Sequence, residues 1–274
     1  MSEAVLELGQ GRFGVLHGAE RPGPWVFVLL NAGAVHRQGP FRLYVQLARQ
    51  LSAVGISSFR FDQAGIGDAV LAAERPQLEG LGEVLDTLQQ RTGCEGFVVG
   101  GICSAADAAW QLARRDTRVR GLLLLDPVAY GGSWFRLGRL LRPRSPRQWL
   151  SALRRSLMPQ GRDAGAVTVE SDYREWPAPE EAADQLAQFC ARGVDVLALY
   201  TGGVAHYFLH RSQFGATFGA AARDPRVRFD YWPEVDHLFY RPADRDRLIQ
   251  HIRTWSLARF SPGAAVCSSE GSHA

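Results

Sequence analysis

The 274-residue sequence contains no lysine, so all 31 of its basic residues are arginine. It also lacks any uninterrupted apolar run of 18 residues, which argues against a membrane-spanning helix. Its first residues, Met1-Ser2-Glu3-Ala4, lack the basic start and apolar stretch of a secretory signal. We therefore expect a cytoplasmic protein without a transmembrane segment.

Cysteine is scarce, and none of the four cysteines forms a C-x-x-C pair; they are Cys94, Cys103, Cys190 and Cys267. This spacing excludes a zinc knuckle and a thioredoxin-like site. In a reducing compartment the thiols should be free, and at least one can be present for its reactivity. The sequence predicts neither a metal ion nor a cofactor.

The formal net charge of +3 is too small to indicate a nucleic-acid-binding protein. The basic residues are nevertheless unevenly spread. Residues 131–162 contain no acidic residue and eight arginines, which are Arg136, Arg139, Arg142, Arg144, Arg147, Arg154, Arg155 and Arg162.

Apolar runs alternate with amphipathic segments along most of the chain, which predicts a mostly parallel sheet flanked by helices. Strands are expected at residues 25–30, 56–61, 96–99, 121–125, 194–200 and 227–232. Helices are expected at residues 41–54, 82–92, 106–114, 206–222 and 244–258. Residues 131–192 contain no convincing core strand. We expect an α/β core of residues 1–130 and 193–260, a basic helical cap at 131–192 inserted after the strand ending at Asp126, and a disordered tail at 261–274.

The segment Gly101-Ile102-Cys103-Ser104-Ala105 has the form of a nucleophile elbow, small-x-nucleophile-x-small, between a predicted strand and a predicted helix. Small residues are needed there because the nucleophile has a strained backbone with chain packed closely on both sides. The helix N-terminus would favour the thiolate of Cys103. A buried structural thiol in a chance pentapeptide is the alternative.

An elbow of this kind takes one oxyanion donor from the backbone N–H after the nucleophile, here Ser104, and another from the loop after an early strand. Asn31-Ala32-Gly33-Ala34 is that loop. Gly33 and Ala34 are small enough to let a substrate oxygen approach the backbone, and Ala34 is the preferred donor. An ordinary strand-to-helix turn would also need the glycine.

Of the seven histidines, His237 alone lies between the last predicted strand and the last predicted helix, where the general base belongs in the chain order nucleophile, acid, histidine. His36 lies near the expected oxyanion loop and is a candidate to line the site. The acid is less clear, since the segment Thr201–His206 after the predicted strand at 194–200 offers no carboxylate. Asp126, one strand earlier, is the candidate, and its alternative is a turn residue before Pro127. Asp236 should point elsewhere, and a Cys–His dyad without an acid is also workable.

Five segments resemble bacterial α/β hydrolases associated with the exosortase A system; they are residues 30–44, 59–68, 101–107, 124–127 and 235–239. The resemblance runs from about Trp25 to Trp255 and leaves out the cap in detail. It implies an α/β-hydrolase fold with a cysteine nucleophile. The departures are Ala105, where such proteins more often have glycine, and Gln63 in the Asp-x-x-Gly loop.

The cap mixes its arginines with apolar residues that include Trp134, a candidate to contact substrate. Such a cap could hold a coenzyme A phosphate, dock an acidic acyl carrier protein or touch anionic lipid. A solvated helical face is the alternative.

The sequence thus predicts an acyl-transfer enzyme, either a hydrolase or thioesterase or an acyltransferase, with Cys103, His237 and Asp126 as catalytic residues. Its partner would be a small-molecule acyl substrate, free or carried on coenzyme A or an acyl carrier protein. The rival hypothesis is a non-nucleophilic member of the fold that acts as a binding protein or as a catalyst using only its pocket.

Overall fold

The computed structural model describes residues 2–9, 11–18, 20, 22–69, 77–141 and 176–261. The expected disordered tail after Ser261 lies outside these residues. So do residues 142–175 of the expected cap, with six of the eight arginines of residues 131–162. In the part that is described, no helix is both long and apolar enough to cross a membrane.

One eight-stranded sheet forms the centre, in the order β1-β2-β4-β3-β5-β6-β7-β8. Its strands are β1 (Glu3–Gly9), β2 (Arg12–His17), β3 (Trp25–Leu29), β4 (Ser57–Phe61), β5 (Gly96–Ile102), β6 (Val119–Leu125), β7 (Asp195–Thr201) and β8 (Val227–Trp232). β1 pairs with β2, and β2 with β4, in the antiparallel sense, whereas every later pairing is parallel. The predicted mostly parallel sheet is confirmed. The two strands before Trp25 were not foreseen.

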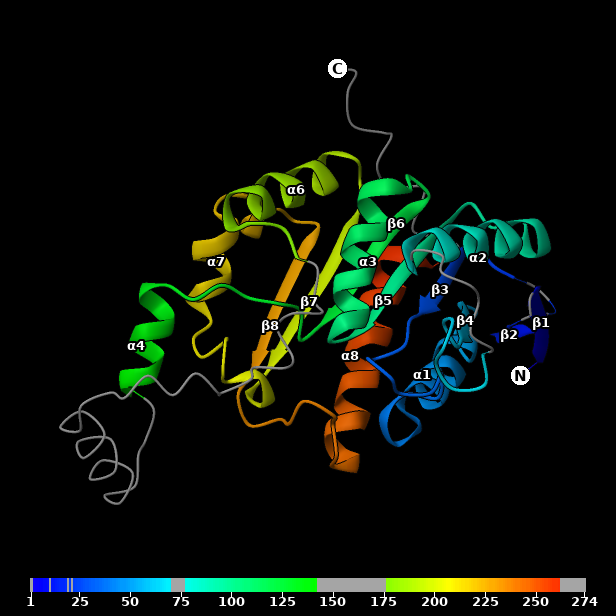
Figure 1. Ribbon diagram of the computed structural model, residues 1–274, viewed down its shortest axis with the longest axis horizontal. Helices are drawn as coiled ribbons and strands as arrows, with labels where there is room; N and C mark the ends of the chain where they lie inside the picture. The colour runs from blue at the N-terminus through cyan, green and yellow to red at the C-terminus, as the bar shows by residue number, and fades with distance from the viewer. Residues whose placement is uncertain are drawn as a thin grey trace.

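Helices cover both faces of this sheet (Figure 1). They are α1 (Leu43–Ser52), α2 (Gln77–Thr92), α3 (Ser104–Arg115), α4 (Ser133–Leu141), α6 (Pro179–Ala191), α7 (Ser212–Phe218) and α8 (Pro242–Phe260), with 3-10 turns η1 (Pro40–Arg42), η2 (Gly202–Val204) and η3 (Ala221–Arg223). The alternating side chains of each central strand explain the two layers. In β3, Phe27 and Leu29 pack with α1 and α8, while Val26 and Val28 pack with α2 and α3.

The helix expected at residues 206–222 is shorter in the structure, where α7 spans only Ser212–Phe218. The Gln213 side chain accepts hydrogen bonds from the backbone N–H groups of Leu209 and His210, at 2.7 and 3.0 Å, so the chain is held in a turn before the helix begins. Gly219, with φ of 56°, ends the helix in a left-handed conformation that glycine adopts readily.

The two described ends of the expected cap differ in how they pack. In Figure 1, α4 stands at the margin of the molecule, on the side of α7. Helix α6 instead lies on the core, where Trp110 of α3 donates a 2.7 Å hydrogen bond to Gln185 and its ring packs edge-on against Phe189, with centroids 4.9 Å apart. Helix α6, at the end of the expected cap, therefore packs as a core helix does. The division between core and cap remains a prediction.

Candidate active site

Cys103 occupies the sharp turn between β5 and α3, with φ of 61° and ψ of −123°. A non-glycine residue in that region is strained, as a nucleophile elbow requires. The turn is also tight, because a Cβ on Gly101 would lie 2.5 Å from the Tyr44 hydroxyl and 2.7 Å from the methyl of Ala105. The methyl group of Ala105 is accommodated because Gly101 has no side chain. The predicted elbow therefore has the expected backbone, and its thiol is half-buried.

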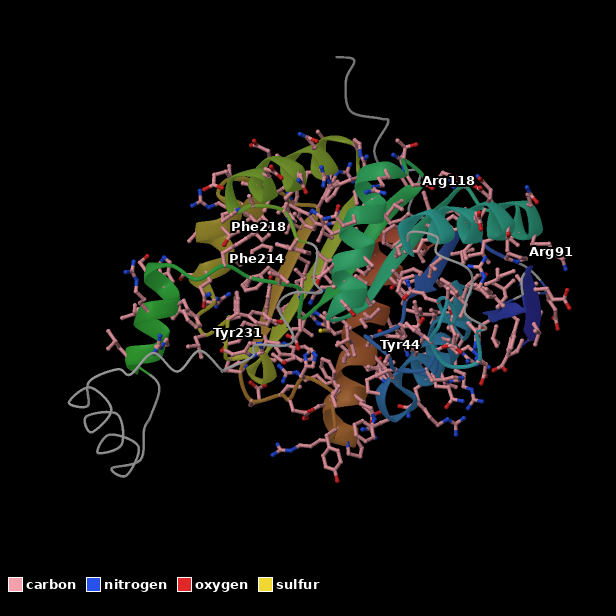
Figure 2. All side chains as sticks on the ribbon, in the orientation of Figure 1. Tyr44, Arg91, Arg118, Phe214, Phe218 and Tyr231 are labelled. Carbon is pink, nitrogen blue, oxygen red and sulfur yellow. The ribbon has the colours of Figure 1, made fainter. Side chains whose placement is uncertain are left out.

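The side chain of Tyr44 contacts the backbone of this turn. Its side chain comes from the first turn of α1, where Figure 2 labels it, and is buried. Its hydroxyl accepts a 3.0 Å hydrogen bond from the backbone N–H of Ile102, the residue before Cys103. Burial raises the pKa of the Tyr44 hydroxyl, so this group stays neutral. Sequence reasoning missed this contact, since the two residues are 58 positions apart and no local pattern joins them.

Asp126, at the end of β6, lies against the His237 imidazole. The distance from His237 Nδ1 to Asp126 Oδ2 is 2.7 Å, and the carboxylate is fully buried. Asp126 also accepts hydrogen bonds from the backbone N–H and the hydroxyl of Thr201, at 2.6 and 2.7 Å. Since Nδ1 bonds the carboxylate, Nε2 is the nitrogen left for Cys103. The structure thus brings together the three residues predicted as nucleophile, base and acid.

The His237 imidazole is electrostatically coupled to both of its neighbours. Burial alone lowers its pKa, but its hydrogen bonds with Asp126 and Cys103 outweigh burial and raise the pKa to about 9. The imidazole is therefore mostly protonated at neutral pH. An imidazolium stabilises an adjacent thiolate, and the thiolate is the nucleophilic form of a cysteine. A serine would need the neutral imidazole as its base.

The other carboxylate near the histidine, Asp236, turns away as expected. It accepts hydrogen bonds from the backbone N–H groups of Leu238 and Tyr240, at 2.9 and 3.0 Å, and so shapes the loop. In the loop after β7, position 203 has no room for a side chain, because a Cβ on Gly203 would lie 2.2 Å from the backbone nitrogen of His237.

The loop after β3 is joined directly to the elbow. The Gly33 N–H donates a 2.9 Å hydrogen bond to the Ser104 hydroxyl oxygen, across 71 positions of sequence. This bond occupies the Gly33 amide. Within the described ranges, the Ala34 N–H has no hydrogen-bond partner, and Ala34 is exposed. The Ala34 N–H therefore remains available to a substrate oxygen, while the role of Gly33 shown here is to hold the Ser104 side chain.

A buried network fixes the same loop from its other side. The Asp62 carboxylate accepts hydrogen bonds from Asn31 Nδ2 at 3.0 Å and from the Arg37 backbone N–H at 2.6 Å, and it also pairs with the Arg37 guanidinium. His36 Nε2 lies 3.4 Å from Asp62 and 3.3 Å from Asp68. His36, predicted to line the site, is thus part of this network. These three side chains are close enough to share a cation, but Arg37 already lies between the two carboxylates, 2.8 Å from Asp68.

Trp134, predicted to contact substrate, lies on α4 with its indole stacked on His210, the ring centroids 4.9 Å apart. Helix α4 stands away from α3 and its elbow (Figure 1). The structure therefore does not bring Trp134 to the cluster of Cys103 and His237.

Comparisons with known proteins bear on the fold. No family model and no curated protein matches the sequence. Solved structures do match. A candidate α/β hydrolase of unknown function from Agrobacterium tumefaciens is 12% identical with a TM-score of 0.58, over 96% of this chain and 98% of that one. This chain has the α/β-hydrolase fold.

Two further α/β-hydrolase structures are similar over nearly their whole length. A serine hydrolase from Cycloclasticus zankles is 10% identical with a TM-score of 0.57, over 94% of this chain and 99% of that one. A thermophilic esterase from Thermogutta terrifontis is 18% identical with a TM-score of 0.51, over 93% of this chain and 98% of that one. At these identities the likeness concerns the fold alone. In this fold the nucleophile, acid and histidine occur in that order along the chain, as Cys103, Asp126 and His237 do.

Proposed function

We propose that this protein is an acyl-transfer enzyme that acts on an ester or thioester through a covalent acyl group on Cys103. The observation that carries the proposal is the chain of contacts Asp126–His237–Cys103 at a strained elbow. The buried carboxylate fixes Nδ1 of the imidazole at 2.7 Å, and a hydrogen bond with Cys103 contributes to the raised pKa of His237. A structural thiol would need neither the strain nor the paired imidazole.

In the first half of the reaction, the proton of Cys103 resides on His237 Nε2, and the thiolate sulfur attacks the substrate carbonyl carbon. The negative charge moves to the carbonyl oxygen, where the N–H groups of Ala34 and Ser104 stabilise it. The intermediate then collapses, its bond to the leaving group breaks, and the imidazolium returns its proton to the departing oxygen or sulfur. The product of this half is a thioester on Cys103.

In the second half, His237 deprotonates an incoming acceptor, which attacks the thioester carbonyl. Collapse of the second intermediate returns the thiol to Cys103, with its proton supplied by His237. Water as acceptor makes the enzyme an esterase or thioesterase, whereas an amine, an alcohol or a carrier thiol makes it an acyltransferase. A cysteine favours transfer, because a thioester is more reactive toward amines than an ester is.

The experiment is turnover of butyryl thioesters of N-acetylcysteamine with and without an amine acceptor, followed by chromatography of the acid and amide products. We expect turnover by the wild type and none by Cys103→Ala, with Cys190→Ala as a matched control. Cys190 is buried, and burial raises the pKa of its thiol to about 11, so this cysteine should not react. Equal turnover by wild type and Cys103→Ala would overturn the proposal. So would a complete lack of turnover and of Cys103 alkylation by iodoacetamide, and the protein would then be a non-nucleophilic member of the fold.

A further inference from the structure

Exposed apolar side chains gather at one point beside the proposed catalytic residues. Among the described residues, eight large hydrophobic side chains are exposed: Val5, Phe41, Trp134, Leu137, Leu140, Leu238, Tyr240 and Leu257. Val5 belongs to β1 and Leu257 to α8. Three of the others belong to α4, which ends at Leu141 where the described range ends. The remaining three are Phe41, Leu238 and Tyr240, and we call them the aromatic rim.

The rim joins two loops that come from distant parts of the sequence. Phe41 follows the proposed oxyanion loop, while Leu238 and Tyr240 directly follow His237. The rings of Phe41 and Tyr240 meet edge to face, with centroids 5.3 Å apart. Both loops lie at the same edge of the sheet, before α1 and before α8 (Figure 1). The rim is therefore continuous with the loop that carries the histidine.

Hydrogen bonds to the backbone of the loop keep the side chains of Leu238 and Tyr240 exposed. Phe239, between Leu238 and Tyr240, is fully buried, and it anchors the loop with φ of 55°. The Asp236 carboxylate binds the backbone N–H groups on both sides of Phe239, and Arg245 donates to the carbonyl oxygens of Phe239 and Tyr240 at 2.9 and 2.6 Å. Leu238 and Tyr240 are thus 43% and 67% exposed on a well-held backbone.

Backbone strain marks the other half of the rim. Phe41 and Arg42 have φ of 50° and 61°, in the left-handed region that non-glycine residues rarely adopt. Such strain is concentrated at binding and catalytic sites. The guanidinium of Arg245 lies over the Phe41 ring, 5.4 Å from its centroid, and holds that ring next to Tyr240. An exposed aromatic side chain that is strained and also fixed in place has the properties of a ligand-binding surface.

We propose that the aromatic rim binds the hydrocarbon chain of the acyl group, so that the substrates are esters or thioesters of medium-length or longer fatty acids. This inference rests on the proposed function, since the chain would extend from the carbonyl carbon beside Cys103. The surface suits such a chain because two aromatic rings and the Leu238 side chain offer mostly apolar area. The guanidinium of Arg245 binds two carbonyl oxygens and lies over the Phe41 ring.

The test is a series of p-nitrophenyl esters from acetate to octanoate. Complete burial of one methylene strengthens binding about fourfold, and a chain lying on an open rim is buried on about one side, which gives about twofold per methylene. The six added methylenes of octanoate should therefore raise kcat/KM about 60-fold over acetate. In the double variant Leu238→Ser, Tyr240→Ser this ratio should fall below about 10. The controls Val5→Ser and Leu257→Ser remove exposed apolar side chains elsewhere and should keep the wild-type ratio.

A flat series in the wild type, or a steep series that the double variant retains, would overturn the rim as the chain-binding surface. Calorimetric titration with octanoate and with acetate separates this result from a failure of the proposed function. If neither ester is turned over, the proposed function falls. In that case, loss of octanoate binding in the double variant but not in the controls would still support the rim. Equal octanoate binding by all variants would refute it.

Discussion

Replacing Asp126 with asparagine tests the catalytic contacts at their most buried point. The substitution keeps the size of the side chain and leaves an oxygen to accept the Thr201 backbone N–H. At the Oδ2 position, however, the variant would carry an NH2 group. This donor would then face the N–H of His237 Nδ1, which is also a donor. The imidazole must then move its proton to Nε2, and the nitrogen that faces Cys103 loses its lone pair.

The magnitude follows from the His237 pKa. The shift from 6.5 to about 9 opposes the effect of burial and is due first to the hydrogen bond with Asp126. Without the carboxylate the pKa should return to about 6.5 or lower, which reduces the ratio of imidazolium to imidazole by about 300-fold. We expect kcat/KM to fall by about 10²–10⁴ at pH 8, with the alkaline limb of the pH profile displaced toward neutral pH.

The assay is hydrolysis of a butyryl thioester from pH 5.5 to 10, with circular dichroism to show that the variant is folded. Asp236→Asn is the matched control, because Asp236 adjoins His237 in sequence but accepts hydrogen bonds from backbone N–H groups instead of the imidazole. Its activity should fall by less than about threefold. The reasoning is refuted if Asp126→Asn keeps activity within threefold of the wild type, or if the two asparagine variants lose equally.

Three further results are expected. Because folding raises the pKa of His237 from 6.5 to about 9, its contribution to stability is complete below pH 6.5 and is lost as the pH rises through 9. Between pH 6 and pH 9.5 the free energy of urea unfolding should fall by about 3 kcal/mol in the wild type but not in His237→Gln. Equal pH dependence of stability in both proteins would contradict this. Ser104→Ala removes the acceptor of the Gly33 N–H. Steady-state kinetics should then show kcat about tenfold lower with little change in KM. A change confined to KM would mean that this hydrogen bond does not position the oxyanion donors. Gly203→Ala places a methyl group 2.2 Å from the backbone of His237. Thermal unfolding should show that the free energy of unfolding falls by at least about 2 kcal/mol. The control Gly215→Ala lies in α7, where a Cβ would meet nothing within 4 Å, so it should leave stability unchanged or raise it.

The parallel core could be read from the sequence because buried strands appear as continuous apolar runs. β8 was predicted with its observed bounds, and β3 to within one residue. β1 was missed, since only one of its seven residues is buried and its pattern resembles that of a surface segment. The turn before α7 was missed because it depends on one side chain, Gln213, which replaces the hydrogen bonds of a helical turn.

At the candidate site, the positions of Cys103 and His237 in the chain order were informative on their own. Asp126 could only be weighed against a turn residue, because its role depends on a contact with His237, which lies 111 positions later in the chain. The bond between Gly33 and Ser104 and the strained backbone at Phe41 have no local signal. Both arise from contacts between loops that the fold brings together, so they required the structure.

The most direct measurement is peptide mass spectrometry after brief incubation with an octanoyl thioester and acid quenching. We expect an added octanoyl mass on the peptide that contains Cys103, absent in Cys103→Ala. An acyl group found instead on Cys94, Cys190 or Ser104, or no acyl group while the substrate is consumed, would show that Cys103 is not the nucleophile.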